Sequence, residues 1–257
     1  MTQPTPQFVT RLTRPSEVPS IARIRHDAFF TNPHNTTPDE LSHLLSLEID
    51  PNLQRPLTRL ESIAKLKTLT SQLYPKPNLF LVGTYLLPPN TDITNDGLGE
   101  DKDSSDLPEG SSLVGLGIWQ KVDERTPPDS EESDKKAEEE PTLLNRFFAR
   151  MNRTREGVMQ GRVYWFLKLL VVDPGFQRKG LGTMLVRWGT RKADKEGVDA
   201  WLESSPMGKG AYLKAGFRVL GVDRVEDERA EKGYVEWPYM IHEHQPTGKK
   251  VERERSV

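Results

Sequence analysis

Residues 171–182 read "VVDPGFQRKGLG". Two valines typical of a buried strand end at an Asp-Pro-Gly turn, and an apolar pattern with helical spacing begins near Lys179. The start of this helix contains Gly180 and Gly182 and follows the cation Arg178. A glycine costs about 1 kcal/mol relative to alanine in a helix, and a cation is unfavourable beside the positive end of the helix dipole. An anion bound at the helix start would account for both features.

The backbone amides at this helix start predict a phosphate site. They have no partner within the helix, and glycines without a Cβ atom let an anion approach them closely. A P-loop requires Gly-Lys-Ser/Thr, but Gly182 precedes Thr183 and Met184. The dinucleotide fingerprint requires a third glycine and a later acid, which are missing here. The pattern that remains is Gln-x-x-Gly-x-Gly, formed by Gln177, Gly180 and Gly182.

The chain around this stretch alternates strands and helices. Residues 162–172 are long and apolar, as in a central strand. The helix from about Lys179 ends at Gly197, and Pro238 suggests that the last strand lies at an edge. The remaining elements of this half are a strand at 198–204, a short helix at 208–215, and strands at 217–225 and 234–243.

The N-terminal half contains strands joined by a long hairpin. Its expected strands are 8–14, 79–87 and 112–122, and its expected helices are 16–29, 57–73 and a short one after residue 141. That last helix would place Leu143, Leu144, Phe147 and Phe148 on an apolar side. Together the halves predict an α/β (α+β) fold, a mixed and mainly antiparallel sheet of six to seven strands flanked by helices. We expect a single domain over residues 8–243.

Three segments lack the side chains needed for a core. Residues 88–110 are rich in Asp, Gly, Pro and Ser, residues 123–141 are acidic, and residues 244–257 form a charged tail. Such compositions do not offset the entropy of ordering by burial. We therefore expect a mobile hairpin insertion, a disordered acidic insertion and a disordered tail. The acidic insertions would act as docking segments for a protein partner or, for the helix after residue 141, as a lid.

Composition excludes several classes of function. A net charge of -2, with no basic stripe, disfavours nucleic acid as a partner. The absence of cysteine removes disulfides, thiolate metal sites and a cysteine nucleophile. No apolar run reaches the length of a membrane span or signal peptide, so we expect no membrane association and a cytoplasmic protein, with the nucleus as the alternative. Monomer and homodimer both stay open.

Two blocks of sequence resemble one known family. The stretch "LLVVDPGFQRKGLG" (169–182) resembles the acyl-CoA signature of the GNAT superfamily of N-acyltransferases, and "WLESSPMGKGAYLKAGFRVLG" (201–221) is similar to the strand and helix that follow it. The flanks look most similar to the small-molecule branch that includes puromycin N-acetyltransferase. The resemblance implies transfer of an acetyl group from acetyl-CoA to a primary amine of a small molecule or peptide, in a ternary complex. The alternative is a non-catalytic acyl-CoA-binding module of the same fold.

The resemblance also assigns coenzyme contacts. The backbone at the end of the central strand would pair with the pantetheine arm, with the Val172 amide facing the thioester oxygen. The amides after the turn would hold the pyrophosphate, and a serine after the next strand would touch pantetheine or cap the following helix. The residues are Leu170, Val171, Val172, Gln177, Arg178, Lys179, Gly180, Leu181, Gly182, Thr183 and Ser205.

Catalytic roles follow in the same way. Tyr212 matches the tyrosine that protonates the coenzyme A sulfur; the alternative is a packing aromatic. Members of the superfamily often carry a glutamate within the central strand, where this sequence has Phe166 to Leu169. Glu203 is therefore the candidate base, with a water chain as the rival. His242 and His244 share a strand face but lack further ligands nearby, so no metal is expected.

Overall fold

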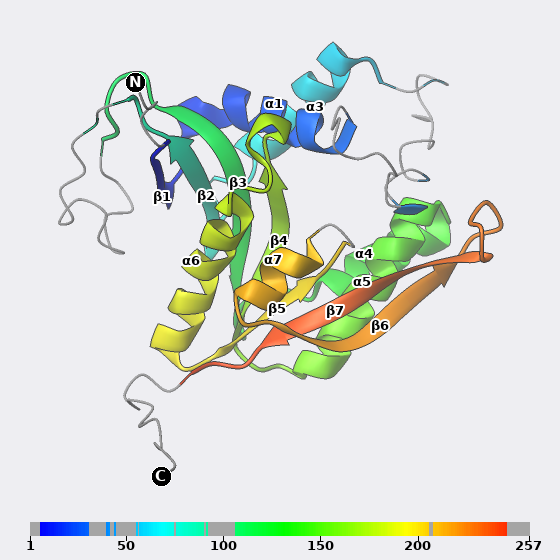
Figure 1. The fold of residues 1–257 in the computed structure, drawn as a ribbon. Coiled ribbons are helices and arrows are strands. Elements are labelled where there is room, and N and C mark those ends of the chain that lie inside the picture. The colour runs from blue at the N-terminus through cyan, green and yellow to red at the C-terminus, as the bar shows by residue number, and fades with distance from the viewer. Residues whose placement is uncertain are drawn as a thin grey trace, which may run out of the picture.

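The computed structural model describes residues 6–30, 40–41, 44, 55, 57–74, 76–89, 91, 106–205 and 208–245. Within them lies a seven-stranded sheet in the order β1-β2-β3-β4-β5-β7-β6 (Figure 1). The strands are β1 (Phe8–Leu12), β2 (Leu79–Leu86), β3 (Ser112–Val122), β4 (Tyr164–Val172), β5 (Asp199–Glu203), β6 (Arg218–Glu226) and β7 (Tyr234–His242). The helices are α1 (Val18–Phe30), α3 (Arg59–Ser71), α4 (Asp129–Glu139), α5 (Leu143–Met159), α6 (Leu181–Glu196) and α7 (Lys209–Lys214).

The strand pairing confirms the expected mixed, mainly antiparallel sheet. Only β4 and β5 run parallel, and they pair at three positions, the last being Phe166 with Trp201. Beyond that point β4 continues along β3, whereas β5 continues along β7. The register between β3 and β4 shifts after Ile118, so that Lys168 is an extra residue on β4. The two central strands therefore part in the middle of the sheet.

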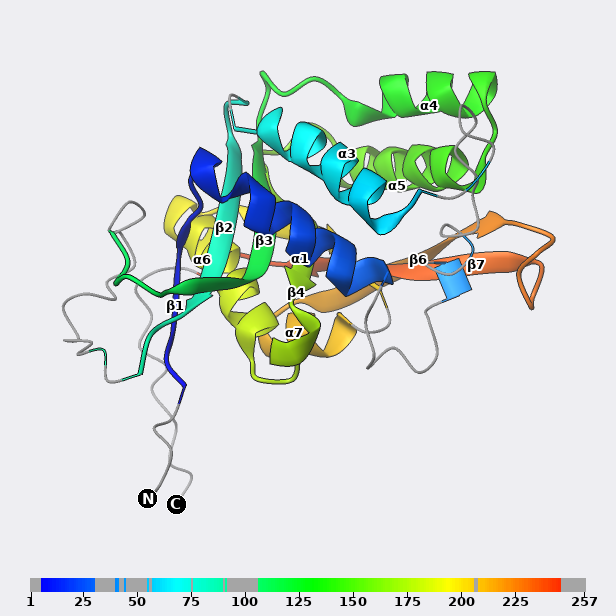
Figure 2. The same ribbon diagram turned by 90° about the horizontal axis from the view of Figure 1, so that it is seen from above.

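Helices cover both faces of the sheet. Figure 2 shows α3, α4 and α5 on one side and α6 and α7 on the other. Alternate residues of β3 serve the two faces: Ile118 packs with α1 residues, and Trp119 packs with α6 residues. Trp119 is fully buried, and its indole N–H donates to the Leu185 carbonyl of α6 at 3.2 Å. These contacts fix α6, and hence its N-terminus, against the centre of the sheet.

The expected edge strand at residues 234–243 lies inside the sheet. β7 runs between β5 and β6, and β6 is the edge. Pro238 is tolerated because β5 ends beside it: the last β5 pair is Glu203 with Tyr239, and the Ser204 amide then donates to the Pro238 carbonyl at 2.8 Å. Proline lacks only the donor, so its carbonyl still serves the sheet. The edge prediction was therefore wrong.

The acidic segment 123–141 differs from the expectation of disorder. Residues Asp129–Glu139 form α4, which packs along α5. Helix α5 is longer than expected, and it turns Leu143 inward while Leu144 and Phe148 stay 38% and 44% exposed. Polar contacts rather than apolar burial join α4 to α5, such as Asn152 Nδ2 to Ser133 Oγ at 3.1 Å. Hydropathy gives no sign of such an interface.

The other expected insertion, 88–110, and the tail, 244–257, lie mostly outside the described residues. None of the helices in the described part combines the length and apolar character needed to cross a bilayer.

Candidate active site

Two side-chain hydrogen bonds and two positive φ angles shape the turn after β4. Asp173 Oδ1 accepts from the Gly175 amide at 3.0 Å, and Gln177 Nε2 donates to the Val172 carbonyl at 3.3 Å. Arg178 and Gly180 then adopt positive φ angles of 61° and 82°. At Gly180 a Cβ atom would meet nothing within 4 Å, so the left-handed conformation, not crowding, favours glycine there. Side chains give no cap to the helix that follows.

The start of α6 lies against β4 and α7. A Cβ atom at Gly182 would lie 3.7 Å from Leu170 Cδ2 and 3.9 Å from Ala211 Cβ. Arg178 and Lys179 are exposed beside it, and Lys179 Nζ lies 4.8 Å from the centre of the Phe176 ring. The structure thus brings together the end of β4, the helix start at 178–183 and the helix that carries Tyr212. Uncapped amides and two exposed cations can hold an anion.

Tyr212 lies on α7 and is only 6% exposed. Its ring packs edge-on against Phe217, with 6.3 Å between ring centres. Burial, and then the charge of Glu203, raise the pKa of the Tyr212 hydroxyl. A Cβ atom at Gly208 would lie 2.6 Å from Tyr212 Cε2, so glycine at 208 makes room for the ring. Tyr212 is therefore a protonated phenol electrostatically coupled to Glu203.

Glu203 is the last residue of β5, where the two central strands have already parted. Its Oε1 accepts from the indole N–H of Trp201 at 2.7 Å. Burial raises the pKa of Glu203, while Arg155, the Trp201 hydrogen bond and Lys168 act against the rise. A carboxylate with a raised pKa is a stronger proton acceptor than one in water. Glu203 and Tyr212 are thus a carboxyl and a phenol whose pKa values both lie above their ordinary values.

Two cations near Glu203 were missed in the sequence. Lys168, the extra residue of β4, places Nζ 2.9 Å from Gln120 Oε1 and 3.3 Å from Asp129 Oδ2, and burial lowers its pKa. Arg155 of α5 is 2% exposed, and its guanidinium lies 4.2 Å over the Phe166 ring. A single charge inside the apolar run "YWFLKLLVV" was a signal for Lys168. Nothing local distinguishes Arg155 from the other arginines of its helix.

Other predicted candidates have structural partners. The Ser205 hydroxyl accepts from the amide of Gly208, the N-cap residue of α7, at 3.2 Å, and α7 itself has no side-chain cap. His242 Nε2 lies 2.9 Å from Asp194 Oδ1, and His244 Nδ1 lies 3.2 Å from Asp199 Oδ1. The two imidazoles therefore contact different carboxylates, and the described residues hold no group of three or more side chains suited to a metal.

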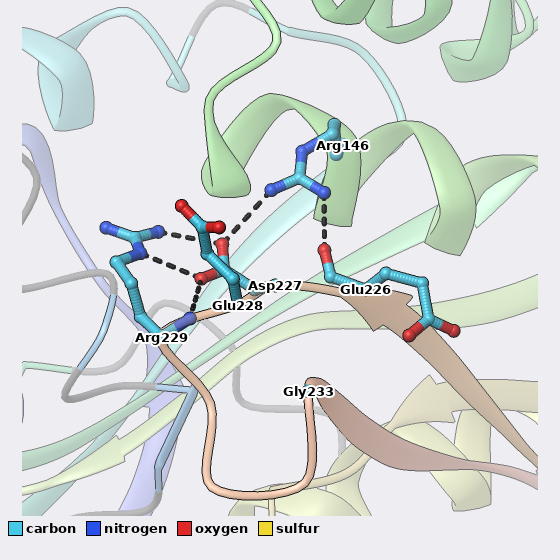
Figure 3. A pocket seen from close by; sticks show the side chains of 6 residues that line it. All are labelled: Arg146, Glu226, Asp227, Glu228, Arg229 and Gly233. Carbon is cyan, nitrogen blue, oxygen red and sulfur yellow. Dashed lines mark hydrogen bonds and ion pairs between the residues drawn. The ribbon is translucent and has the colours of Figure 1, made fainter.

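None of these residues lines the pocket at the β6–β7 turn, which is formed by Arg146, residues 226–229 and Gly233 (Figure 3). Asp227 is its centre: Arg146 Nη2 lies 3.0 Å from Asp227 Oδ2, and Arg229 donates to both Asp227 oxygens. The Arg229 hydrogen bonds lower the pKa of Asp227 to about 2. These charges satisfy one another and tie the turn to α5, so we assign the pocket a structural role.

Comparison with known proteins identifies the domain. The sequence profile of the acetyltransferase (GNAT) family matches residues 118–217, which include β4, the glycine-rich turn, α6, β5 and α7. Residues 118–217 belong to the GNAT acetyltransferase family. The resemblance inferred from the two sequence blocks is therefore confirmed. An acetyltransferase of Stachybotrys chartarum is 34% identical to this chain over 93 residues, which are 36% of this chain and 40% of that protein.

Solved structures extend the similarity of the GNAT domain to most of the chain. An arylalkylamine N-acetyltransferase-like protein (5b) from mosquito has a TM-score of 0.54 at 15% identity, covering 91% of this chain and 99% of its own. Arylalkylamine N-acetyltransferase 2 of Aedes aegypti gives 0.55 at 16% identity, covering 91% and 98%. A Drosophila melanogaster polyamine N-acetyltransferase gives 0.53 at 13% identity, covering 91% and 99%. At these identities they establish the GNAT fold.

Proposed function

We propose that this protein is an acyl-CoA-dependent N-acetyltransferase that transfers an acetyl group from acetyl-CoA to a primary amine of a small molecule or peptide. One observation carries the proposal. The central strands part after Phe166 and Trp201, and the glycine-rich helix start, Tyr212 and Glu203 lie around that point. Membership of residues 118–217 in an acetyltransferase family supports the same enzyme class.

The coenzyme would lie along the end of β4 and across the start of α6. Its diphosphate suits the amides from Arg178 to Thr183 and the two exposed cations, because an anion is stabilised at a helix N-terminus. Its amide-like pantetheine arm suits the β4 backbone at 170–172, which pairs with β3 on one side and is beyond the β5 pairing on the other. Ser205 would contact pantetheine only by giving up its contact with the Gly208 amide.

The chemical step then needs three groups. The neutral amine attacks the thioester carbon, and the carbonyl oxygen becomes an oxyanion that a backbone amide, proposed as that of Val172, stabilises. The C–S bond breaks as the tetrahedral intermediate collapses, and the thiolate takes the proton of Tyr212. The nitrogen loses its extra proton to Glu203, directly or through water. The products are the N-acetyl amine and coenzyme A, and solvent then returns a proton to Tyr212 and takes the proton from Glu203.

A thiol-release assay tests the proposal directly. The chain has no cysteine, so a thiol reagent reports only the coenzyme A that is formed. We expect turnover of acetyl-CoA with at least one of tryptamine, agmatine and an alanyl peptide amide. Thermal stabilisation by coenzyme A without release of thiol on any amine would instead support the non-catalytic binding module.

Glu203→Gln tests the assignment of the base. Because Glu203 accepts a proton only when ionised, kcat/KM should fall as pH falls through its raised pKa. The Gln variant should lose this acidic limb and about 100-fold of kcat. If the Gln variant keeps the acidic limb of the wild-type kcat/KM profile, water and not Glu203 accepts the proton.

A further inference from the structure

The acidic helix α4 reaches the strand that carries the candidate site. Its first residue, Asp129, accepts with Oδ2 from Arg155 Nη2 at 2.8 Å and from Lys168 Nζ at 3.3 Å. One carboxylate therefore bridges a cation of α5 and a cation of β4. Both cations also act electrostatically on Glu203 of β5.

The groups that act electrostatically on Glu203 come from four elements. Arg155 belongs to α5, Lys168 and Tyr164 to β4, and Tyr212 to α7, while the Trp201 indole belongs to its own strand. Arg155 and Lys168 stabilise the ionised form of Glu203, and Glu156 lies 3.8 Å from Arg155. Asp129 supplies the negative charge that balances the two cations from outside the sheet.

Arg155 depends on this balance. Its side chain is 2% exposed, and its Nε and Nη1 have no hydrogen-bond partner in the described part of the chain. The bond to Asp129 is thus a main anchor of a buried guanidinium. Loss of the carboxylate at 129 would leave the charges of Arg155 and Lys168 less compensated, so both would stabilise the ionised form of Glu203 more strongly.

We infer that Asp129 is a positioning residue of this site: it engages Lys168 and Arg155, so that Glu203 stays free to accept a proton from the acceptor amine. The role in proton transfer rests on the proposed function, whereas the coupling of Asp129 to Glu203 does not. The acidic insertion is then a working part of the site, not only a docking segment for a partner.

The Trp201 indole offers a direct reporter. Its N–H donates to Glu203, so the indole resonance in a ¹⁵N–¹H spectrum should follow the ionisation of Glu203. The chain has five tryptophans, and Trp201→Phe identifies the signal by its loss. Glu203→Gln should abolish the titration midpoint of that signal, which assigns the midpoint to Glu203. The measurement needs neither coenzyme nor acceptor.

A matched pair of α4 variants makes the test specific. Asp134 also joins α4 to α5, through Arg153 at 2.8 Å, but it has no contact with Lys168 or Arg155 in the described structure. We expect Asp129→Asn to lower the midpoint by about half a pH unit or more, because the cations then act more strongly on Glu203. Asp134→Asn should leave the midpoint unchanged, and Asp129→Glu, which keeps the carboxylate, should keep the midpoint close to the wild-type value.

Four outcomes separate the explanations. An unchanged or raised midpoint in Asp129→Asn would overturn the inference, as would an equal shift in Asp134→Asn, which would indicate general loosening of α4. If an amine of the panel turns over, the acidic limb of kcat/KM should move to lower pH in Asp129→Asn only. If the midpoint shifts in Asp129→Asn but no amine turns over, the coupling of Asp129 to Glu203 stands and the proposed function is wrong.

Discussion

On the two faces of the central sheet, the residues of the candidate site are distributed differently along the chain. On the α6 and α7 side, the predicted coenzyme contacts come from one continuous stretch, residues 170–183, followed closely by α7. On the α4 and α5 side, the charged cluster joins Asp129, Arg155, Lys168 and Glu203, which come from four separate elements. A motif confined to one turn is readable from sequence, whereas a cluster assembled by packing emerges only in three dimensions.

Removal of the Tyr212 hydroxyl should have the largest effect on catalysis. Tyr212→Phe deletes the proton donor on the α7 side while keeping the ring that packs on Phe217, so kcat should fall about 100-fold and affinity for coenzyme A should not change. Steady-state kinetics and calorimetric binding check the two halves of this statement. Tyr234→Phe, at a tyrosine stacked with Arg224, is the matched control. Unchanged turnover would make Tyr212 a packing residue.

Substitution of two glycines by alanine should show that α6 is packed tightly at Gly189 and that α5 has open space at Gly157. A Cβ atom at Gly189 of α6 would lie 2.2 Å from the Trp119 ring, whereas one at Gly157 of α5 would meet nothing within 4 Å. Gly189→Ala should therefore destabilise the protein by about 1–3 kcal/mol. Gly157→Ala should stabilise it by about 0.5–1 kcal/mol. Urea unfolding measures both, and equal effects of one sign would refute the contrast.

The cations of the turn should have the smallest effect. Arg178 and Lys179 are exposed, so their attraction to a diphosphate is screened by salt. The double change to alanine should weaken coenzyme A binding about fivefold at low salt, and less at high salt. Lys195→Ala, in the last turn of the same helix, should leave binding as it was. If both variants bind alike, the cations have no part in the site.

Most of the fold was predictable because its elements carry local signals. The strand at 164–172, the helix that ends at Gly197 and the glycine turn between them follow the expected positions. The position of residues 234–243 inside the sheet was not predictable. Pro238 lies in β7 beside the point where β5 ends, and in sequence such a proline looks the same as one in an edge strand. Helix α4 escaped prediction because ion pairs and polar contacts, not apolar residues, hold it to α5.

The sequence predicted only part of the candidate site. Tyr212 and Glu203 lie in one block with a family resemblance, and burial and the charge of Glu203 raise the pKa of Tyr212. Asp129 and Arg155 lay outside that block, and their roles depend on a sheet register that places Lys168 as an extra residue facing them. In the sequence, only the single charge of Lys168 in an apolar strand indicated this cluster.

Amide hydrogen exchange with and without coenzyme A tests whether the end of β4 and the start of α6 bind the coenzyme. Coenzyme A should slow exchange at residues 170–172 and 178–183, where backbone amides would bind the pantetheine and the diphosphate, and should leave α5 at 143–159 unchanged. Protection confined to other segments, or no protection at saturating coenzyme A, would contradict the assignment of this helix start as the coenzyme site.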